Sequence, residues 1–185
     1  MNVLALPGSL RAASINAALC RAAARLAPPG QRITVWGDLG LLPLFNPDFE
    51  DAPPHAVARF RAAIGGADAL LIASPEYAHG ISGAMKNALD WLVSYEAFVA
   101  KPVAVINSSA RARHAHESLL EVLKTMSATV VDEASVTVPL LGSCTTEDAM
   151  LSTPAVASQI RSALIALSEF VSPGSRRGPS FPIAS

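Results

Sequence analysis

A cluster of hydrogen-bond donors follows the first apolar run of the chain. Residues 7–16 read Pro-Gly-Ser-Leu-Arg-Ala-Ala-Ser-Ile-Asn, which places the hydroxyls of Ser9 and Ser14, the guanidinium of Arg11 and the amide of Asn16 in one short loop. A helix that begins near Ser14 would add unpaired backbone N–H groups and the positive end of its dipole. These donors together favour an anion with several oxygens, such as a phosphate monoester.

Two other interpretations of this loop stay open. Ser14 is a common N-cap residue, and Ser9 and Arg11 could be ordinary surface residues. Alternatively, Ser9 could be an exposed nucleophile after a strand, which predicts an esterase activity that disappears in Ser9→Ala. That chemistry needs a paired histidine, and none of the four histidines lies in a triad motif. The loop contains neither Gly-x-Gly-x-x-Gly nor a P-loop, which argues against those two phosphate sites.

A second candidate region is the stretch 74–91, which reads Ser-Pro-Glu-Tyr-Ala-His-Gly-Ile-Ser-Gly-Ala-Met-Lys-Asn-Ala-Leu-Asp-Trp. Pro75 stiffens its first part, Glu76 offers an acceptor or a charge, and Tyr77 offers an aromatic face. Gly80 and the glycine three positions later permit close approach of the backbone to a flat ligand.

The hydrophobic pattern predicts the elements that position these residues. Short apolar runs predict five strands, over residues 2–7, 32–36, 69–73, 102–107 and 129–138, the last with an irregularity at Asp132-Glu133. Helical stripes and end signals predict five helices, over about 14–26, 55–64, 82–93, 113–127 and 154–171. The alternation predicts an α/β domain with a doubly wound parallel sheet and helices on both faces. Ligands of such domains lie at the carboxyl ends of the strands, where both candidate regions begin.

The composition excludes several classes of protein. With 185 residues, 51% hydrophobic and 16% charged, the chain suits one globular domain, expected over 1–171, followed by a flexible tail over 172–185. The net charge of −1 gives no electrostatic reason to expect nucleic acid or a membrane surface as partner.

The sequence shows neither a membrane span, nor a secretory signal, nor a pattern of cysteines typical of secreted proteins. The longest run without a charged residue, 134–146, has 13 residues, whereas a spanning helix needs about 20. We therefore expect no membrane span. We also expect no secretory signal, because the opening apolar run, 2–7, is too brief for a signal core and has no basic flank. The two cysteines, Cys20 and Cys144, suit neither a disulfide framework nor a metal cluster, so we expect a reducing, cytoplasmic location and no metal site.

The two candidate regions together resemble the NADPH-dependent FMN reductase family, flavodoxin-like proteins that include quinone, chromate and azo-dye reductases. The resemblance rests on Gly-Ser-Leu-Arg-x-x-Ser-x-Asn at 8–16 and on Ser-Pro-Glu-Tyr…Gly…Gly…Lys-Asn-Ala-Leu-Asp-Trp at 74–91, and it spans roughly 1–167. It implies the strand order 2-1-3-4-5, FMN as cofactor, and NADPH or NADH as donor of hydride.

The resemblance also implies roles for individual residues. The FMN phosphate would be held by Ser9, Arg11, Ser14 and Asn16. The edge of the isoalloxazine ring would be lined, mainly by backbone groups, by Pro75, Glu76, Tyr77 and Gly80. Ser108 and Ser109, after the fourth strand, could bond to the ring or to the ribityl chain. Arg111 and Arg113 could bind the extra phosphate of NADPH, or could be two solvated arginines at a helix start.

Four residues of the second region match the helix motif of the family, and two neighbouring positions depart from the family pattern. We interpret Lys86, Asn87, Asp90 and Trp91 as chiefly structural, ordering a loop or an oligomer contact. Ala78 stands where relatives often have Asn, and Ser82 where they often have Pro. These departures affect the stiffness of the loop and the substrate face, and leave the phosphate site unchanged.

The resemblance implies an NAD(P)H-dependent FMN reductase or quinone reductase that passes hydride from nicotinamide to flavin, and on to a quinone, flavin, azo or metal-ion acceptor. Because the flavin carries the chemistry, no catalytic side chain is predicted. The expected partners are the small-molecule acceptor and further copies of the chain, in a homodimer or homotetramer. The alternative is a non-enzymatic flavodoxin-type electron carrier; such carriers are typically strongly acidic, and a net charge of −1 argues against that role.

Overall fold

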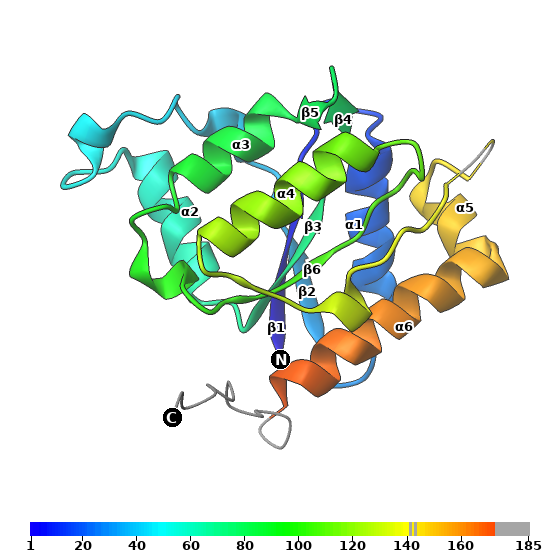
Figure 1. Cartoon of the computed structure of the whole chain (residues 1–185). Coiled ribbons are helices and arrows are strands. Elements are labelled where there is room, and N and C mark those ends of the chain that lie inside the picture. The colour runs from blue at the N-terminus through cyan, green and yellow to red at the C-terminus, as the bar shows by residue number, and fades with distance from the viewer. Residues whose placement is uncertain (141, 143, 173–185) are drawn as a thin grey trace, which may run out of the picture.

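A parallel five-stranded sheet forms the centre of the molecule (Figure 1). The computed structural model describes residues 1–140, 142 and 144–172. The strands are β1 (Asn2–Pro7), β2 (Arg32–Val35), β3 (Ala69–Ala73), β6 (Pro102–Val105) and β7 (Thr129–Val130). They lie in the order β2-β1-β3-β6-β7, which confirms the predicted doubly wound sheet and its strand order.

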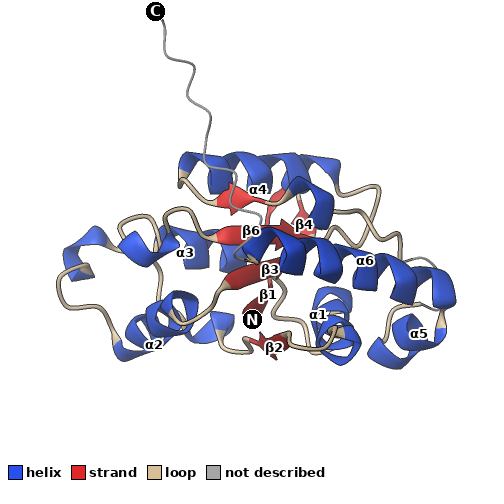
Figure 2. Ribbon diagram, turned by 90° about the horizontal axis from the view of Figure 1, so that it is seen from below, coloured by secondary structure: helices blue, strands red, loops and turns tan. Residues whose placement is uncertain are grey.

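Helices cover both faces of the sheet (Figure 2). One face carries α1 (Ile15–Leu26), α5 (Glu147–Ser152) and α6 (Pro154–Val171), and the other carries α2 (His55–Gly65), α3 (Gly83–Asp90) and α4 (Arg113–Thr125). The strands divide their side chains between the two apolar clusters. On β1, Val3 and Ala5 pack toward α1 and α6, whereas Leu4 and Leu6 pack toward the opposite layer. All five residues of β3 are buried, as expected for the central strand.

The segment predicted as a fifth strand is interrupted. Strand β7 ends at Val130, a 3-10 helix follows at Asp132–Ala134, and the chain returns to the sheet where Thr137 pairs with Asn107. The predicted irregularity at Asp132-Glu133 is therefore confirmed, while the continuous strand over 129–138 is wrong. Ser135 compensates for the break, because its Oγ accepts the N–H of Val105 at 3.1 Å.

Other predicted bounds also need correction. The stretch 74–80, expected as a loop, contains a hairpin of β4 (Glu76–Tyr77) and β5 (Gly80–Ile81). Helix α3 ends at Asp90 instead of residue 93, and α5 was not predicted. Residues 173–185 of the expected tail lie outside the described residues. No helix among the residues described has the length and apolar character needed to cross a membrane.

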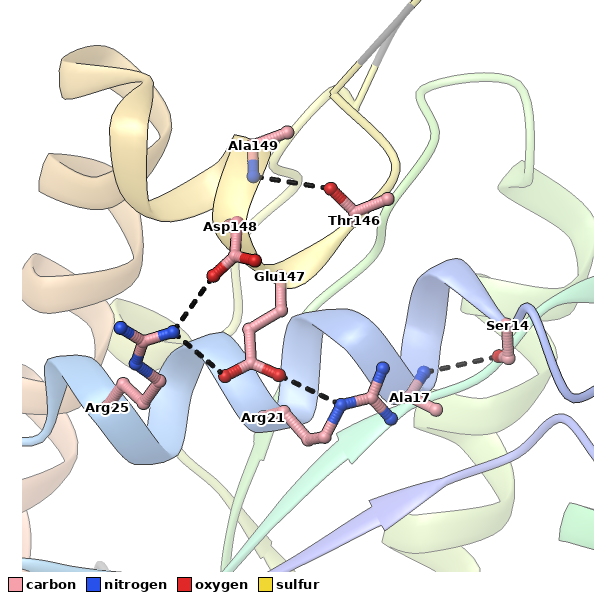
Figure 3. A network of polar contacts seen from close by, with 8 residues as sticks. All are labelled: Ser14, Ala17, Arg21, Arg25, Thr146, Glu147, Asp148 and Ala149. Carbon is pink, nitrogen blue, oxygen red and sulfur yellow. Dashed lines mark hydrogen bonds and ion pairs between the residues drawn. The ribbon is translucent and has the colours of Figure 1, made fainter.

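Ion pairs attach α5 to α1 (Figure 3). Arg21 Nε lies 3.0 Å from Glu147 Oε2, and Arg25 Nη1 lies 3.4 Å from Glu147 Oε1 and 3.0 Å from Asp148 Oδ1. The two arginines are four positions apart and so lie on one face of α1. Both are half-exposed, so each pair contributes at most about 1 kcal/mol.

Candidate functional site

A cavity of about 390 Å³ opens at the carboxyl ends of β1, β3 and β6, where a doubly wound sheet is expected to bind its ligand. Nine of the ten predicted cofactor residues line it: Ser9, Arg11, Ser14, Asn16, Pro75, Glu76, Tyr77, Ser108 and Ser109. The tenth, Gly80, lies in β5 opposite Tyr77 and is not part of the cavity wall. The sheet therefore brings together three loops that are far apart in the sequence.

The loops after β1 and β3 meet at Gly8. Its N–H donates to the carbonyl of Ala73 at 2.8 Å, and a Cβ at this position would lie 2.8 Å from the Cβ of Ser74. Ser82, which is 2% exposed, donates its hydroxyl to the Gly8 carbonyl and accepts the N–H of Met85 as the N-cap of α3. Ser82 therefore fixes the loop after β1 on α3, a positioning role that the sequence analysis did not identify, although a serine before a helix could have suggested it.

The start of α1 forms the first wall of the cavity. Ser14 is the N-cap, as one interpretation of the sequence expected, and its Oγ accepts the N–H of Ala17 at 3.2 Å. Asn16 is 5% exposed, and its Oδ1 accepts the hydroxyl of Ser108 at 3.0 Å, so its amide N–H groups remain as donors. The first N–H groups of the helix have no partner inside the helix. This wall is consequently rich in donors.

Arg11 carries the charge of the first wall. Its side chain is exposed, and no acceptor in the described part of the chain is bonded to its guanidinium. Its backbone N–H reaches Ser9 Oγ at 3.4 Å, and the same Oγ lies 3.5 Å from the hydroxyl of Tyr77. These partners of Ser9 include no histidine, so the structure does not supply the base that a serine nucleophile needs.

The β4–β5 hairpin forms the opposite wall and is held by α4. Glu76 Oε2 accepts the N–H of Ala115 at 2.9 Å in the first turn of α4, where a carboxylate is favoured by the helix dipole. At the tip of the hairpin, the ring of His79 lies against that of His114, with centroids 4.5 Å apart. Ala78 and His79 have φ of 49° and 57°, a left-handed conformation that Asn adopts more readily than Ala.

The loop after β6 forms the third wall and is shaped by Asn107. This side chain is 6% exposed; its Oδ1 accepts the N–H of Ser109 at 3.1 Å and its Nδ2 donates to the carbonyl of Ala112 at 3.4 Å. The sequence analysis did not single out Asn107, whose position directly after a strand is the available signal. Arg111 lines the cavity, whereas Arg113 does not.

The helix motif after β3 orders a loop, as interpreted from the sequence. Asn87 Nδ2 and Trp91 Nε1 donate to the carbonyl of Pro43 at 2.9 and 2.8 Å, and Asn87 Oδ1 accepts the N–H of Phe45 at 2.8 Å. Lys86 and Asp90, one turn apart on α3, form an ion pair. The motif thus holds the segment 43–45 against α3.

Outside this cavity, the described residues include one buried cysteine, Cys20. Burial raises the pKa of the Cys20 thiol to about 12, so this thiol is protonated and inert near neutral pH. Among the described residues, no group of three or more His, Cys, Asp and Glu side chains could hold a metal ion.

Comparisons with known proteins agree with this geometry. A family model described as NADPH-dependent FMN reductase matches residues 1–140. The NAD(P)H-dependent FMN reductase of Pseudomonas aeruginosa is 42% identical over 113 residues, 60% of this chain and 60% of that protein. A quinone reductase of Pseudomonas putida is 38% identical over 112 residues, 58% of this chain and 60% of its own length.

A solved structure shows the same fold over more of the chain. The flavoenzyme NAD(P)H:(acceptor) oxidoreductase FerB of Paracoccus denitrificans superposes with a TM-score of 0.74 and 23% identity, covering 91% of this chain and 97% of that one. The alignments with the curated relatives span about three fifths of their lengths. The match to the family model over residues 1–140 shows that the chain belongs to the NADPH-dependent FMN reductase family.

Proposed function

We propose that this protein is an FMN-dependent NAD(P)H oxidoreductase that reduces a small acceptor: a quinone, a free flavin, an azo compound or an oxidised metal ion. The observation that carries the proposal is the gathering of nine predicted cofactor residues around one cavity, in a chain that belongs to a family of FMN reductases. Bound FMN would supply the redox chemistry by accepting hydride from the nicotinamide and passing electrons to the acceptor.

The first wall suits the phosphate of FMN. Arg11 offers a guanidinium that no acceptor in the described residues uses, and Ser9 and Ser14 offer hydroxyl groups beside it. The N-terminus of α1 adds unpaired N–H groups and a partial positive charge. A phosphate dianion needs several donors at once, and this wall supplies them from one loop.

The other two walls suit a flat ring. Pro75 and Tyr77 line one side of the cavity, and Ser108 and Ser109 line another. The carboxylate of Glu76 already accepts the N–H of Ala115 at the start of α4. Glu76 would therefore contact the ring through its backbone groups, and its carboxylate would stay bonded to α4. No side chain needs to move a proton in this proposal, since the walls bind and orient the cofactor.

A homo-oligomer belongs to the same proposal. Leu44 and Phe49 are 85% and 50% exposed, and the segment that carries Leu44 is held in place by Asn87 and Trp91. Exposed apolar side chains on a fixed segment favour an interface between subunits. We expect Leu44→Asp to lower the assembly mass in light scattering, and an unchanged mass would contradict this interface.

Both cysteines are free, which supports a reducing compartment such as the cytoplasm.

The experiment that tests the enzymatic function is an anaerobic titration of the FMN-loaded protein with NADPH, followed by the visible absorbance of the flavin. Rapid bleaching is the expected result. A flavin that binds and stays oxidised with both NADPH and NADH would favour the electron-carrier alternative. A protein that does not load FMN would contradict the proposed site.

A further inference from the structure

One hydrogen bond joins two walls of the first cavity whose residues are 92 positions apart in the sequence. The hydroxyl of Ser108, in the loop after β6, donates to Asn16 Oδ1 at the start of α1, at 3.0 Å. The resemblance implied that Ser108 bonds to the ring or to the ribityl chain of the flavin. In the structure, the hydrogen of this hydroxyl is already used by Asn16, so Ser108 acts on a wall other than its own.

Both residues of this contact are held in place by the fold. Asn16 lies in the first turn of α1 and is 5% exposed. The carbonyl of Ser108 accepts the N–H of Leu140 at 3.1 Å. On either side of it, Asn107 Oδ1 accepts the N–H of Ser109, which fixes the turn of the loop. The Ser108 hydroxyl therefore reaches Asn16 without any rearrangement of the loop, and the contact costs little conformational entropy.

The contact determines which end of the Asn16 amide is available to a ligand. A carbonyl oxygen can only accept, so Oδ1 is turned toward the Ser108 hydroxyl. The Nδ2 group, at the other end of the amide, has no acceptor among the described residues. In the described part of the chain, the buried side-chain atoms that lack a partner are Gln31 Oε1 and Trp36 Nε1, so Nδ2 is not sealed from solvent. Because Asn16 lines the cavity, its two N–H groups are donors at the cavity wall.

The other side-chain donors of this wall are less firmly held or have another task. The contacts of Ser9 Oγ are 3.4 and 3.5 Å long, beyond the ordinary range of such bonds. A second cavity, of about 480 Å³, lies on the other side of the segment 9–11 and leaves it without support there. Ser14 is the N-cap of α1, and its Oγ is bonded to the N–H of Ala17 (Figure 3). Asn16 is thus a donor that the protein itself orients before a ligand arrives.

We infer that Ser108 is a positioning residue for the FMN phosphate, which it serves by turning the Nδ2 group of Asn16 toward that phosphate. The inference rests on the proposed function. Without the Ser108 hydroxyl, an amide that donates to the phosphate leaves Oδ1 buried without a partner, and the opposite orientation presents Oδ1 to an anion. Both arrangements lower the affinity for FMN. Riboflavin has no phosphate and should be unaffected.

The test compares the dissociation constants of FMN and riboflavin for the flavin-free protein, measured by fluorescence titration. Ser108→Ala should raise the constant for FMN by about three- to tenfold, the range of one hydrogen bond, and leave that for riboflavin nearly unchanged. Ser108→Thr keeps the hydroxyl and should retain the wild-type ratio of the two constants.

Ser109→Ala is the matched comparison. Ser109 lines the same cavity, but its Oγ accepts the N–H of Arg111 at 3.2 Å and is not bonded to Asn16. Any loss of affinity in Ser109→Ala should therefore be equal for the two flavins.

A double-mutant cycle separates an effect through Asn16 from a direct contact with the ligand. Asn16→Ala should lower the affinity for FMN relative to that for riboflavin. Adding Ser108→Ala to this variant should change the ratio little further, because the amide that Ser108 orients is gone. Urea denaturation of each variant shows that the protein which is titrated is folded.

Three results would overturn the inference. One is a wild-type ratio of the two constants in Ser108→Ala. Another is an equal loss of FMN and riboflavin in Ser108→Ala, which would mean that Ser108 contacts the ring or the ribityl chain. The third is the same loss of FMN selectivity from Ser108→Ala with and without Asn16, which would mean that Ser108 meets the phosphate itself.

The proposed function is tested separately on the wild-type protein. Equal affinities of the wild-type protein for FMN and riboflavin would contradict the phosphate site, and the inference with it. A wild-type preference for FMN that Ser108→Ala leaves unchanged would overturn the inference alone.

Discussion

Two walls face each other across the first cavity and use their polar groups in opposite ways. In the loop after β1, the guanidinium of Arg11 has no acceptor among the described residues, and the hydroxyl of Ser9 lies at the edge of the cavity. In the β4–β5 hairpin, Glu76 bonds to the first turn of α4 and His79 lies against His114. The first wall keeps its groups for a ligand, whereas the second uses them to hold itself in place.

The loop after β1 should therefore determine which ligand the cavity selects, whereas the β4–β5 hairpin should contribute mainly to the stability of the fold. A charged group without a partner in the protein can discriminate between ligands by their charge, at little cost to the fold when it is removed. A carboxylate that caps a helix contributes to the free energy of unfolding, and its loss affects every ligand of the cavity alike. Substitutions in the two walls should therefore give two kinds of result.

The largest effect is expected for Arg11→Ala. If the guanidinium binds the phosphate, the dissociation constant of FMN should rise by about 10- to 100-fold, and that of riboflavin should change little. Fluorescence titration with both flavins measures the two constants. Arg113→Ala, an exposed arginine outside the cavity wall, is the control. If Arg11→Ala lowered the affinities for FMN and riboflavin by the same factor, Arg11 would not belong to the phosphate site.

The next effect is expected for Glu76→Ala in the opposite wall. Loss of the bond to the Ala115 N–H should lower the free energy of unfolding by about 1 kcal/mol. It should also lower the affinities for FMN and for riboflavin by the same factor. Urea denaturation and flavin titration provide the measurements, with Glu117→Ala, an exposed residue of α4, as the control. A change in the ratio of the two flavin affinities would show that Glu76 also contacts the ligand through its charge.

A smaller effect is expected at the tip of the hairpin. Ala78 has a φ of 49°, which costs an alanine about 1 kcal/mol, so Ala78→Gly should raise the free energy of unfolding by about 0.5 kcal/mol. Ala110→Gly, at an exposed position without a positive φ, should not raise it. A thermal melt that shows Ala78→Gly to be less stable than the parent protein would contradict this account of the turn.

The smallest effect is expected for Tyr77→Phe. Its hydroxyl lies 3.5 Å from Ser9 Oγ, a long contact between the two walls. Its removal should change the free energy of unfolding by less than about 0.5 kcal/mol and leave the FMN affinity within about threefold. A large loss of FMN affinity would mean that the two walls act as one unit, and the comparison between them would fail.

Most of the fold could be predicted from the sequence, because long helical stripes and buried apolar strands are local patterns. The hairpin could not be predicted, since strands of two residues show no alternation and its turn, Ala78-His79, contains neither Gly nor Asn. Helix α5 has six residues and is too short for a stripe. The break after β7 was visible only as two acidic residues in an apolar run, which do not reveal that the chain rejoins the sheet at Thr137.

The positions of the candidate residues could be predicted for a similar reason, because each follows a strand whose carboxyl end reaches the same edge of the sheet. Their partners could not be predicted. The Ser108 hydroxyl reaches Asn16, Glu76 reaches the N-terminus of α4, and Ser82 reaches the carbonyl of Gly8. These contacts join segments that are distant in the sequence, and no local pattern records them. They decide which polar groups remain available to a ligand.

The measurement that tests the central claim most directly is the affinity of the flavin-free wild-type protein for FMN and for riboflavin. The two flavins differ only in the phosphate, so their ratio reports what the loop after β1 contributes. We expect FMN to bind at least about tenfold more tightly, and the difference to shrink as the salt concentration rises. Equal affinities at low salt would show that this loop is not a phosphate site and would contradict the account.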